Sequence, residues 1–225
     1  MKTLILSLGG SLIAPDKPDY FFIREFKNFV LDRCDKYRFI IVCGGGKTAS
    51  HYVNAALRVS KVDDKNLDWI GIMATRLNAE LIRTVFGELA DGKVIYNPTE
   101  KIKSDKKIIV AAGYEPGWST DYDSVLLAEQ FGANEIINMT NIDYVYDKDP
   151  GKHKDAKKLV DISWKDYRKI SGSKWTPRLN LPFDPIASKQ AQKSKLKVVI
   201  LNGKKLSNIE NYLLDKDFKG TVIHG

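Results

Sequence analysis

Two glycine-rich turns, each placed directly after an apolar run, constrain this chain most. Gly9 and Gly10 follow the apolar run 3–8, and three glycines at 44–46 follow the run 39–43. Each pattern predicts a buried strand that ends at the glycines and leads into a helix. Glycine lets the backbone approach a ligand closely, and the free N–H groups of a helix N-terminus attract anions. The two turns therefore predict a binding site for a phosphate-rich ligand.

The rest of the chain alternates between strand-like and helix-like segments. The predicted strands cover 3–8, 39–43, 93–96, 107–111, 135–139, 197–201 and 220–224. The predicted helices cover 19–34, 47–60, 67–90, 121–131, 164–170, 185–194 and 206–214. In the helix 67–90, the expected core-facing stripe is Ile70, Met73, Leu77, Leu81, Val85 and Leu89. This alternation predicts an α/β fold with a mostly parallel sheet and helices on both faces.

The composition is compatible with one large α/β domain or with two lobes that share a sheet. The chain has 225 residues, of which 43% are apolar, and this is enough for a substantial core. No apolar run is long enough to span a bilayer, and no cleavable leader follows Met1. We therefore expect a cytoplasmic protein without a membrane partner.

The net charge of +8 does not by itself predict a nucleic-acid surface. Lysines cluster at 101–107, 152–158 and 189–197, but apolar or acidic residues interrupt each cluster and no aromatic residues are interleaved. Such clusters are typical of solvated faces, and we expect no nucleic-acid partner. The three histidines show no spacing typical of a metal site, so no metal-ligating residue is predicted.

A second candidate ligand loop covers 113–121, between a predicted strand and a predicted helix. It combines glycine, hydroxyl and aromatic side chains, and Thr120 or Asp121 is expected to cap the helix. A third polar loop at 138–150 offers hydroxyl, amide, carboxylate and phenol groups that suit a ribose and a base. Ordinary capped turns remain the alternative interpretation of both loops.

These segments, taken in order, resemble the amino acid kinase superfamily, most closely the archaeal type of uridylate kinase. The resemblance rests on Leu8-Gly9-Gly10-Ser11, the glycines 44–46, the segment 70–79, the loop 113–121, the segment 140–150, Phe183-Asp184-Pro185 and the closing 220–223. The segment from Met73 to Ala79 is the most specific of these motifs.

The resemblance implies a three-layer α/β/α sandwich of the carbamate kinase-like type, formed by one domain over 1–225. It divides this domain into an acceptor-side lobe at about 1–139 and an ATP-side lobe at about 140–225. It also implies transfer of the γ-phosphoryl group of ATP, with Mg²⁺, to UMP, which gives UDP and ADP for pyrimidine nucleotide synthesis. Members of this type usually assemble as hexamers built from dimers.

The resemblance also assigns residues to the two nucleotides and to the reacting centre. The residues implied for ATP are Gly9, Gly10, Ser11, Gly46, Thr140, Asn141, Tyr146 and Asp149. The residues implied for UMP are Gly45, Asp68, Arg76, Tyr114, Glu115, Pro116, Gly117, Trp118, Ser119 and Thr120. Asp121 and Asp184 are the implied catalytic carboxylates, with an orienting role, because a phosphate acceptor oxygen is already anionic and needs no strong base.

The chain departs from the family pattern at two expected cations. Ser7 occupies a position where many members have lysine, and Ser50 occupies one where arginine is expected. Lys47, Lys174, Arg178 and Lys189 are candidates to compensate. The departures leave open a nucleotide-binding or sensory protein with weak or no turnover. A kinase for another small acceptor and an RNA-binding protein are lower-ranked alternatives.

Overall fold

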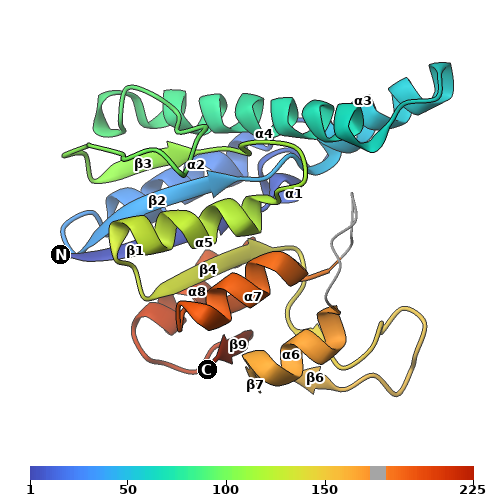
Figure 1. Cartoon of the computed structure of the whole chain (residues 1–225). Coiled ribbons are helices and arrows are strands. Elements are labelled where there is room, and N and C mark those ends of the chain that lie inside the picture. The colour runs from blue at the N-terminus through green and yellow to red at the C-terminus, as the bar shows by residue number, and fades with distance from the viewer. Residues whose placement is uncertain (173–180) are drawn as a thin grey trace.

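A computed structural model describes residues 1–172 and 181–225, and its described part is built around a seven-stranded sheet (Figure 1). The strand order is β3-β2-β1-β4-β8-β9-β7. The bounds are β1 Lys2–Leu8, β2 Tyr37–Cys43, β3 Ile108–Ala111, β4 Glu135–Thr140, β7 Asp161–Ser163, β8 Lys197–Asn202 and β9 Thr221–His224. A separate antiparallel pair consists of β5 (Val145–Tyr146) and β6 (Lys158–Leu159).

Most neighbouring strands of this sheet are parallel. β1 pairs in parallel with β2 and β4, β2 with β3, and β4 with β8, whereas β9 is antiparallel to β8. The carboxyl ends of β1, β2, β3, β4 and β8 therefore lie along one edge of the sheet. Loops that leave this edge are where α/β proteins bind ligands.

Helices cover both faces of the sheet. The helices are α1 Gly10–Ile13, α2 Tyr20–Leu31, α3 Gly46–Val59, α4 Asp64–Phe86, α5 Thr120–Phe131, α6 Trp164–Ser171, α7 Pro185–Lys193 and α8 Leu206–Leu213, with a 3₁₀ turn at Gly87–Leu89. One hydrophobic cluster packs α2, α4 and α8 against the sheet, and a second cluster packs α5, α6 and α7 against the opposite face. The predicted three-layer α/β/α sandwich is confirmed (Figure 1).

Burial on both faces explains why the central strands have nearly continuous apolar sequences. In β1, Leu4 and Leu6 belong to one hydrophobic cluster and Ile5 to the other, and all three are fully buried. A strand covered on both faces does not need to alternate polar and apolar residues. For the same reason, these strands were predictable from their apolar runs.

Two expected elements differ from the structure. The expected stripe of the helix 67–90 is wrong at Met73, Leu77 and Leu89, which are 58%, 63% and 54% exposed. Its members Leu81 and Val85 do pack against the core. The core-facing side of α4 also includes Ile82 and Phe86. The segment 93–96 forms only an isolated bridge from Ile95 to Ala111 and no named strand.

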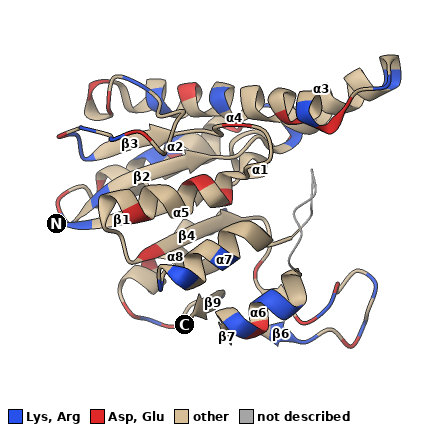
Figure 2. Ribbon diagram, viewed as in Figure 1, with Lys and Arg blue, Asp and Glu red and all other residues tan. Residues whose placement is uncertain are grey.

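The charges on the described residues are distributed over several elements. Figure 2 shows Lys and Arg on separate helices and loops, with Asp and Glu among them. Within the part of the chain that the structure describes, no helix combines the length and apolar character that a bilayer crossing requires.

Candidate functional site

The two glycine-rich turns lie against each other at the carboxyl edge of β1 and β2. The Gly44 amide donates to the carbonyl of Leu8 at 2.9 Å, which joins the ends of the two strands. A Cβ atom on Gly10 would lie 2.3 Å from the amide nitrogen of Gly46, and Gly46 itself has a φ of 57°. No larger residue fits these two positions without moving the backbone. The first turns of α1 and α3 therefore start side by side.

An asparagine side chain from α4 binds the backbone of the triple glycine. Asn78 is buried, and its Nδ2 donates to the carbonyls of Gly44 at 2.8 Å and of Gly45 at 3.3 Å. These bonds fix the orientation of two carbonyl groups of the turn. Sequence reasoning did not assign a role to Asn78, although it lies inside the motif 70–79.

The loop after β3 is held by three side chains of α4. Thr75 Oγ1 accepts from the Gly113 amide at 2.8 Å, and Asp68 Oδ2 accepts from the Gly117 amide at 2.9 Å. Arg76 donates through Nε to the carbonyl of Gly113 at 3.3 Å and through Nη2 to that of Tyr114 at 2.9 Å. The loop is thus attached to α4 at both of its ends.

The helix after this loop begins one residue earlier than expected. The cap of α5 is Ser119, whose Oγ accepts from the Tyr122 amide at 3.2 Å, so the expected cap at Thr120 or Asp121 is wrong. Ser119 can cap because its backbone is extended, whereas Thr120 is already helical. Asp121 consequently lies in the first helical turn.

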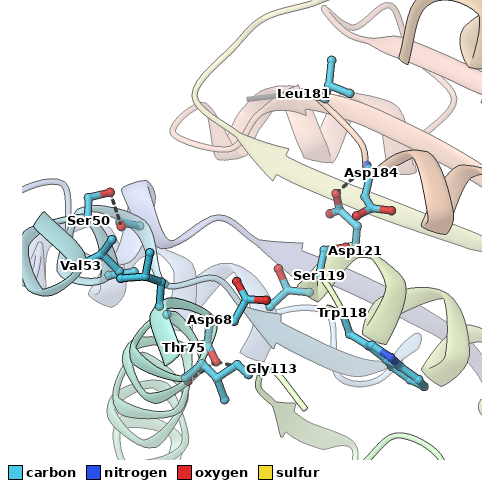
Figure 3. A pocket seen from close by; sticks show the side chains of 17 residues that line it. Ser50, Val53, Asp68, Thr75, Gly113, Trp118, Ser119, Asp121, Leu181 and Asp184 are labelled. Atoms are coloured by element: carbon cyan, nitrogen blue, oxygen red, sulfur yellow. Dashed lines mark hydrogen bonds between the residues drawn. The ribbon is translucent and has the colours of Figure 1, made fainter. Parts of the chain in front are cut away.

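Asp121 and Asp184 meet where the first turns of α5 and α7 approach each other. Asp121 Oδ2 accepts from the Asp184 amide at 3.0 Å, and Asp184 Oδ1 accepts from the amides of Ile186 and Ala187 at 2.6 and 2.8 Å (Figure 3). Burial, followed by the neighbouring carboxyl group of Asp184, raises the pKa of Asp121 to about 7. Burial also raises the pKa of Asp184. The two carboxyl groups are therefore suited to accepting hydrogen bonds and thereby orienting the donor groups around them.

A cavity of about 390 Å³ opens beside these carboxylates. Figure 3 shows Asp121 and Asp184 facing one another, with Asp68 and Ser119 directed toward the same space. The predicted residues that line it are Gly45, Gly46, Asp68, Trp118, Ser119, Thr120, Asp121 and Asp184. Apolar side chains such as Val53, Leu67 and Ile72 complete the wall. The cavity thus combines an apolar wall with carboxylate and hydroxyl groups.

A second cavity, of about 670 Å³, lies beside the first. Its lining includes the predicted residues Thr140, Asn141, Tyr146 and Asp149. Tyr167, which sequence reasoning missed, also lines it, and its hydroxyl donates to the carbonyl of Phe183 at 2.9 Å. Leu181 borders both cavities. The two cavities therefore share this residue as part of their walls.

Several predicted residues do not line either of these cavities. Gly9, Gly10 and Ser11 form the turn beside the triple glycine, and Gly117 borders a small third cavity of about 130 Å³. Four further predicted residues are absent from the linings of the first and second cavities. They are Arg76 on α4 and the loop residues Tyr114, Glu115 and Pro116. The guanidinium group of Arg76 instead packs 4.6 Å from the ring centre of Tyr96.

Of the four candidate compensating cations, Lys47 and Lys189 are exposed on α3 and α7. Lys174 and Arg178 lie outside the described residues. Among the described residues that line the first cavity, none is a lysine or an arginine.

Comparison with known proteins identifies relatives over nearly the whole chain. Residues 2–202 match the Amino acid kinase family. The chain is 33% identical to a uridylate kinase of Sulfurisphaera tokodaii, with 98% of both proteins covered. It is 36% identical to a uridylate kinase of Pyrococcus abyssi, again with 98% of both covered.

The fold is also similar to that of solved structures. The crystal structure of uridylate kinase from Archaeoglobus fulgidus superposes with a TM-score of 0.82 at 32% identity, covering 99% of this chain and 100% of that one. UMP kinase from Ureaplasma parvum superposes with a TM-score of 0.78 at 20% identity, which shows a common fold.

Proposed function

This chain belongs to the amino acid kinase family, and we propose that it is a uridylate kinase that transfers the γ-phosphoryl group of ATP to UMP, giving UDP and ADP. The observation that carries the proposal is that two cavities share the lining residue Leu181 and that Asp121 and Asp184 line the first of them. Two nucleotides placed in these cavities would meet at their phosphates. The relatives named uridylate kinase support this reaction over a binding or sensory role.

We assign the first cavity to UMP and the second to ATP. The first has apolar walls and the Asp68 carboxylate, and the loop 113–120 forms part of it. The second, with the side chains of Thr140, Asn141 and Tyr146, suits a ribose and a purine base. The glycine turns at 9–10 and 44–46 present backbone amides to the phosphate chain between the two nucleosides.

The residues of this chain act on the reaction mainly through position and charge. Phosphoryl transfer needs the donor and the acceptor held in line, and the acceptor phosphate oxygen is already a nucleophile. The first turns of α3, α5 and α7 start at the site, and their positive ends attract the phosphates. Asp121 and Asp184 orient the groups that surround the transferred phosphoryl.

The residues present fit a Mg²⁺ ion that is carried mainly by the nucleotide. The described residues hold no group of three or more His, Cys, Asp or Glu side chains that could form a dedicated metal site. Mg²⁺ commonly keeps several waters and binds to substrate phosphates, so such a site is not required. When bound, the ion neutralises charge that develops on the phosphates.

The assembly is a proposal supported by the exposed face of α4. Trp69, Met73 and Leu77 are 39%, 58% and 63% exposed at helical spacing along this face. A stripe of large apolar side chains on a helix is typical of a surface that another subunit covers. We propose that two copies pair through α4 and that such dimers form the hexamer that the resemblance implies.

A coupled assay for ADP tests the activity directly. Purified protein with ATP and Mg²⁺ is given UMP, CMP, AMP or GMP in turn, and we expect ADP formation that depends on UMP. The Asp184→Asn variant is the matched control for contaminating kinases and should lose most of the rate. Absence of UMP-dependent ADP from protein that still binds both nucleotides would reject the proposal.

A further inference from the structure

The segment 181–184 leads into α7 and carries lining residues of both cavities. Leu181 lines both cavities, and Asp184 lines the first one (Figure 3). Asp184 also caps α7, because its Oδ1 accepts from the amides of Ile186 and Ala187. The place of the Asp184 carboxyl group in the site therefore depends on how the backbone of this segment is held.

Side chains from three elements bind consecutive residues of this segment. Asn138 Nδ2, on β4, donates to the carbonyl of Pro182 at 2.9 Å. Asp121 Oδ2, on α5, accepts from the amide of Asp184 at 3.0 Å. Phe183, which lies between these two residues in the sequence, is bound through both of its backbone polar groups by one side chain of α6.

That side chain is Tyr167, and its hydroxyl group forms both bonds. The hydroxyl accepts from the amide of Phe183 at 2.8 Å and donates to the carbonyl of Phe183 at 2.9 Å. Burial raises the pKa of Tyr167 above its ordinary value, so the hydroxyl keeps the proton that it donates. A tyrosine hydroxyl has a single proton, and here the backbone receives it. The hydroxyl of Tyr167 thus acts on the protein and not on a ligand, although the residue lines the second cavity.

The backbone of Phe183 depends on this hydroxyl group because the residue is removed from water. Phe183 has 0% of its surface exposed, so its amide and carbonyl cannot turn to solvent without moving the segment. Loss of the hydroxyl would leave two buried backbone groups unpaired, and a shift of the segment would relieve that cost. Since Phe183 directly precedes Asp184, such a shift would displace the Asp184 carboxyl group from its place in the first cavity.

We propose that Tyr167 is a positioning residue that holds the Asp184 carboxyl group in its reactive place through the backbone of Phe183. The inference rests on the proposed function, which places Asp184 at the reacting centre. Tyr167 lines the cavity assigned to ATP, whereas Asp184 lines the cavity assigned to UMP. The hydroxyl group therefore connects the wall of the donor site to a carboxyl group of the acceptor site, and it affects the rate through geometry alone.

Tyr167→Phe tests this role, because it removes one hydroxyl group and keeps the ring. We expect kcat to fall about tenfold while KM for UMP and KM for ATP change less than about twofold, since a small displacement at the reacting centre weakens the transition state more than binding. Tyr212→Phe is the matched control. It also removes a tyrosine hydroxyl that is hydrogen-bonded, to Glu135 Oε2 at 2.6 Å, but it lies on α8 and is absent from the linings of both cavities.

Thermal unfolding separates positioning from a general loss of stability. Both variants should unfold at a lower temperature than the original protein, because each leaves a buried partner unpaired, but only Tyr167→Phe should lose kcat. An unchanged kcat in Tyr167→Phe would overturn the proposal. A raised KM for ATP with unchanged kcat would overturn it as well, because the hydroxyl would then contact ATP. If Tyr167→Phe does not fold, Asn138→Ala releases the neighbouring carbonyl of Pro182 and is held to the same expected fall in kcat.

Amide hydrogen exchange followed by NMR keeps the inference separate from the proposed activity. If the original protein forms no ADP from UMP, the proposed function fails, but exchange at the Asp184 amide can still be measured. Faster exchange at both Phe183 and Asp184 in Tyr167→Phe, with unchanged exchange in β1, supports the positioning role. Unchanged exchange at Asp184 would reject it, because the hydroxyl would then affect Phe183 alone.

Discussion

Asp121 Oδ2 accepts a hydrogen bond of 3.0 Å from the backbone N–H of Asp184, and this bond joins the first turns of α5 and α7. The two helices lie on the same face of the sheet but are separated along the sequence by β4 and α6. Their starts meet at the carboxyl edge, where both proposed nucleotide sites open. The contact thus couples the acceptor loop that precedes α5 to the segment that precedes α7.

Substitution of Asp121 by Asn should stabilise the protein in a pH-dependent way. Burial and the neighbouring Asp184 disfavour the charged form of Asp121 and raise its pKa from the ordinary value of 3.8 to about 7 in the folded protein. Between these pH values the folded protein holds a proton that the unfolded chain has released, so the Asp121 contribution to stability falls as pH rises. We expect Asp121→Asn to be more stable by ~2–3 kcal/mol at pH 8.

Urea unfolding followed by circular dichroism at pH 5, 6.5 and 8 measures this difference. The gain should shrink steadily as pH decreases toward 4. A gain of the same size at every pH would show that the asparagine acts through packing or hydrogen bonding rather than through the missing charge.

Alanine at Gly46 should abolish nucleotide binding and destabilise the fold. The positive φ of 57° disfavours any side chain, and the added Cβ would lie 2.3 Å from the carbonyl carbon of Gly10. The φ strain alone should cost about 1–3 kcal/mol, and the clash adds to it. Gly92→Ala is the control, since nothing lies within 4 Å of its added Cβ. Calorimetric titration with ATP and a thermal melt compare the two variants.

Arginine at residue 50 should increase the activity. Ser50 lies on α3 in the wall of the first cavity, and the described lining contains no cationic side chain. A guanidinium group there can pair with a phosphate in a partly desolvated site, and we expect kcat/KM for UMP to rise about tenfold. Ser60→Arg, at the other end of α3, adds the same charge away from the cavity and should leave the rate unchanged. Equal effects of both variants would indicate general electrostatic attraction.

A charge on the exposed face of α4 should dissociate the proposed dimer. Leu77 is 63% exposed in the isolated chain, and a glutamate at its position would have to be buried without a partner in a helix-to-helix contact. We expect Leu77→Glu to elute at a smaller mass in size-exclusion chromatography with light scattering, with unchanged circular dichroism. Lys165→Glu on α6 is the charge-change control. An unaltered mass for Leu77→Glu would place the subunit contact elsewhere.

The fold was largely predictable because its central strands are buried on both faces and its turns need glycine. The runs at 3–8 and 39–43 leave few alternatives to buried strands, and the cap at Asp19 is confirmed by its bond to the Phe22 amide at 3.0 Å. The buried face of α4 was not predictable from hydrophobicity. Leu77 and Met73 are as apolar as core residues, whereas the polar Asn78 is buried because it binds backbone carbonyls.

The candidate site was predictable in its loops but not in its supporting contacts. The family resemblance assigned Asp68, Asp121 and Asp184 to the site, and the structure places these three in the lining of one cavity. Arg76 and Thr75 bind backbone atoms of Gly113, and such partners leave no side-chain pattern in a sequence. Leu181 borders both cavities, and this is a tertiary arrangement that no local motif encodes.

The shared wall at Leu181 has a consequence for inhibitor chemistry. One molecule in which a uridine and an adenosine are tethered through a chain of phosphates would occupy both spaces at once. Because the compound is a single molecule, its binding costs the translational and rotational entropy of one ligand, whereas separate nucleotides lose that of two. We therefore expect it to bind much more tightly than either nucleotide alone. The tether length that gives the tightest binding would report the distance between the two bound nucleosides.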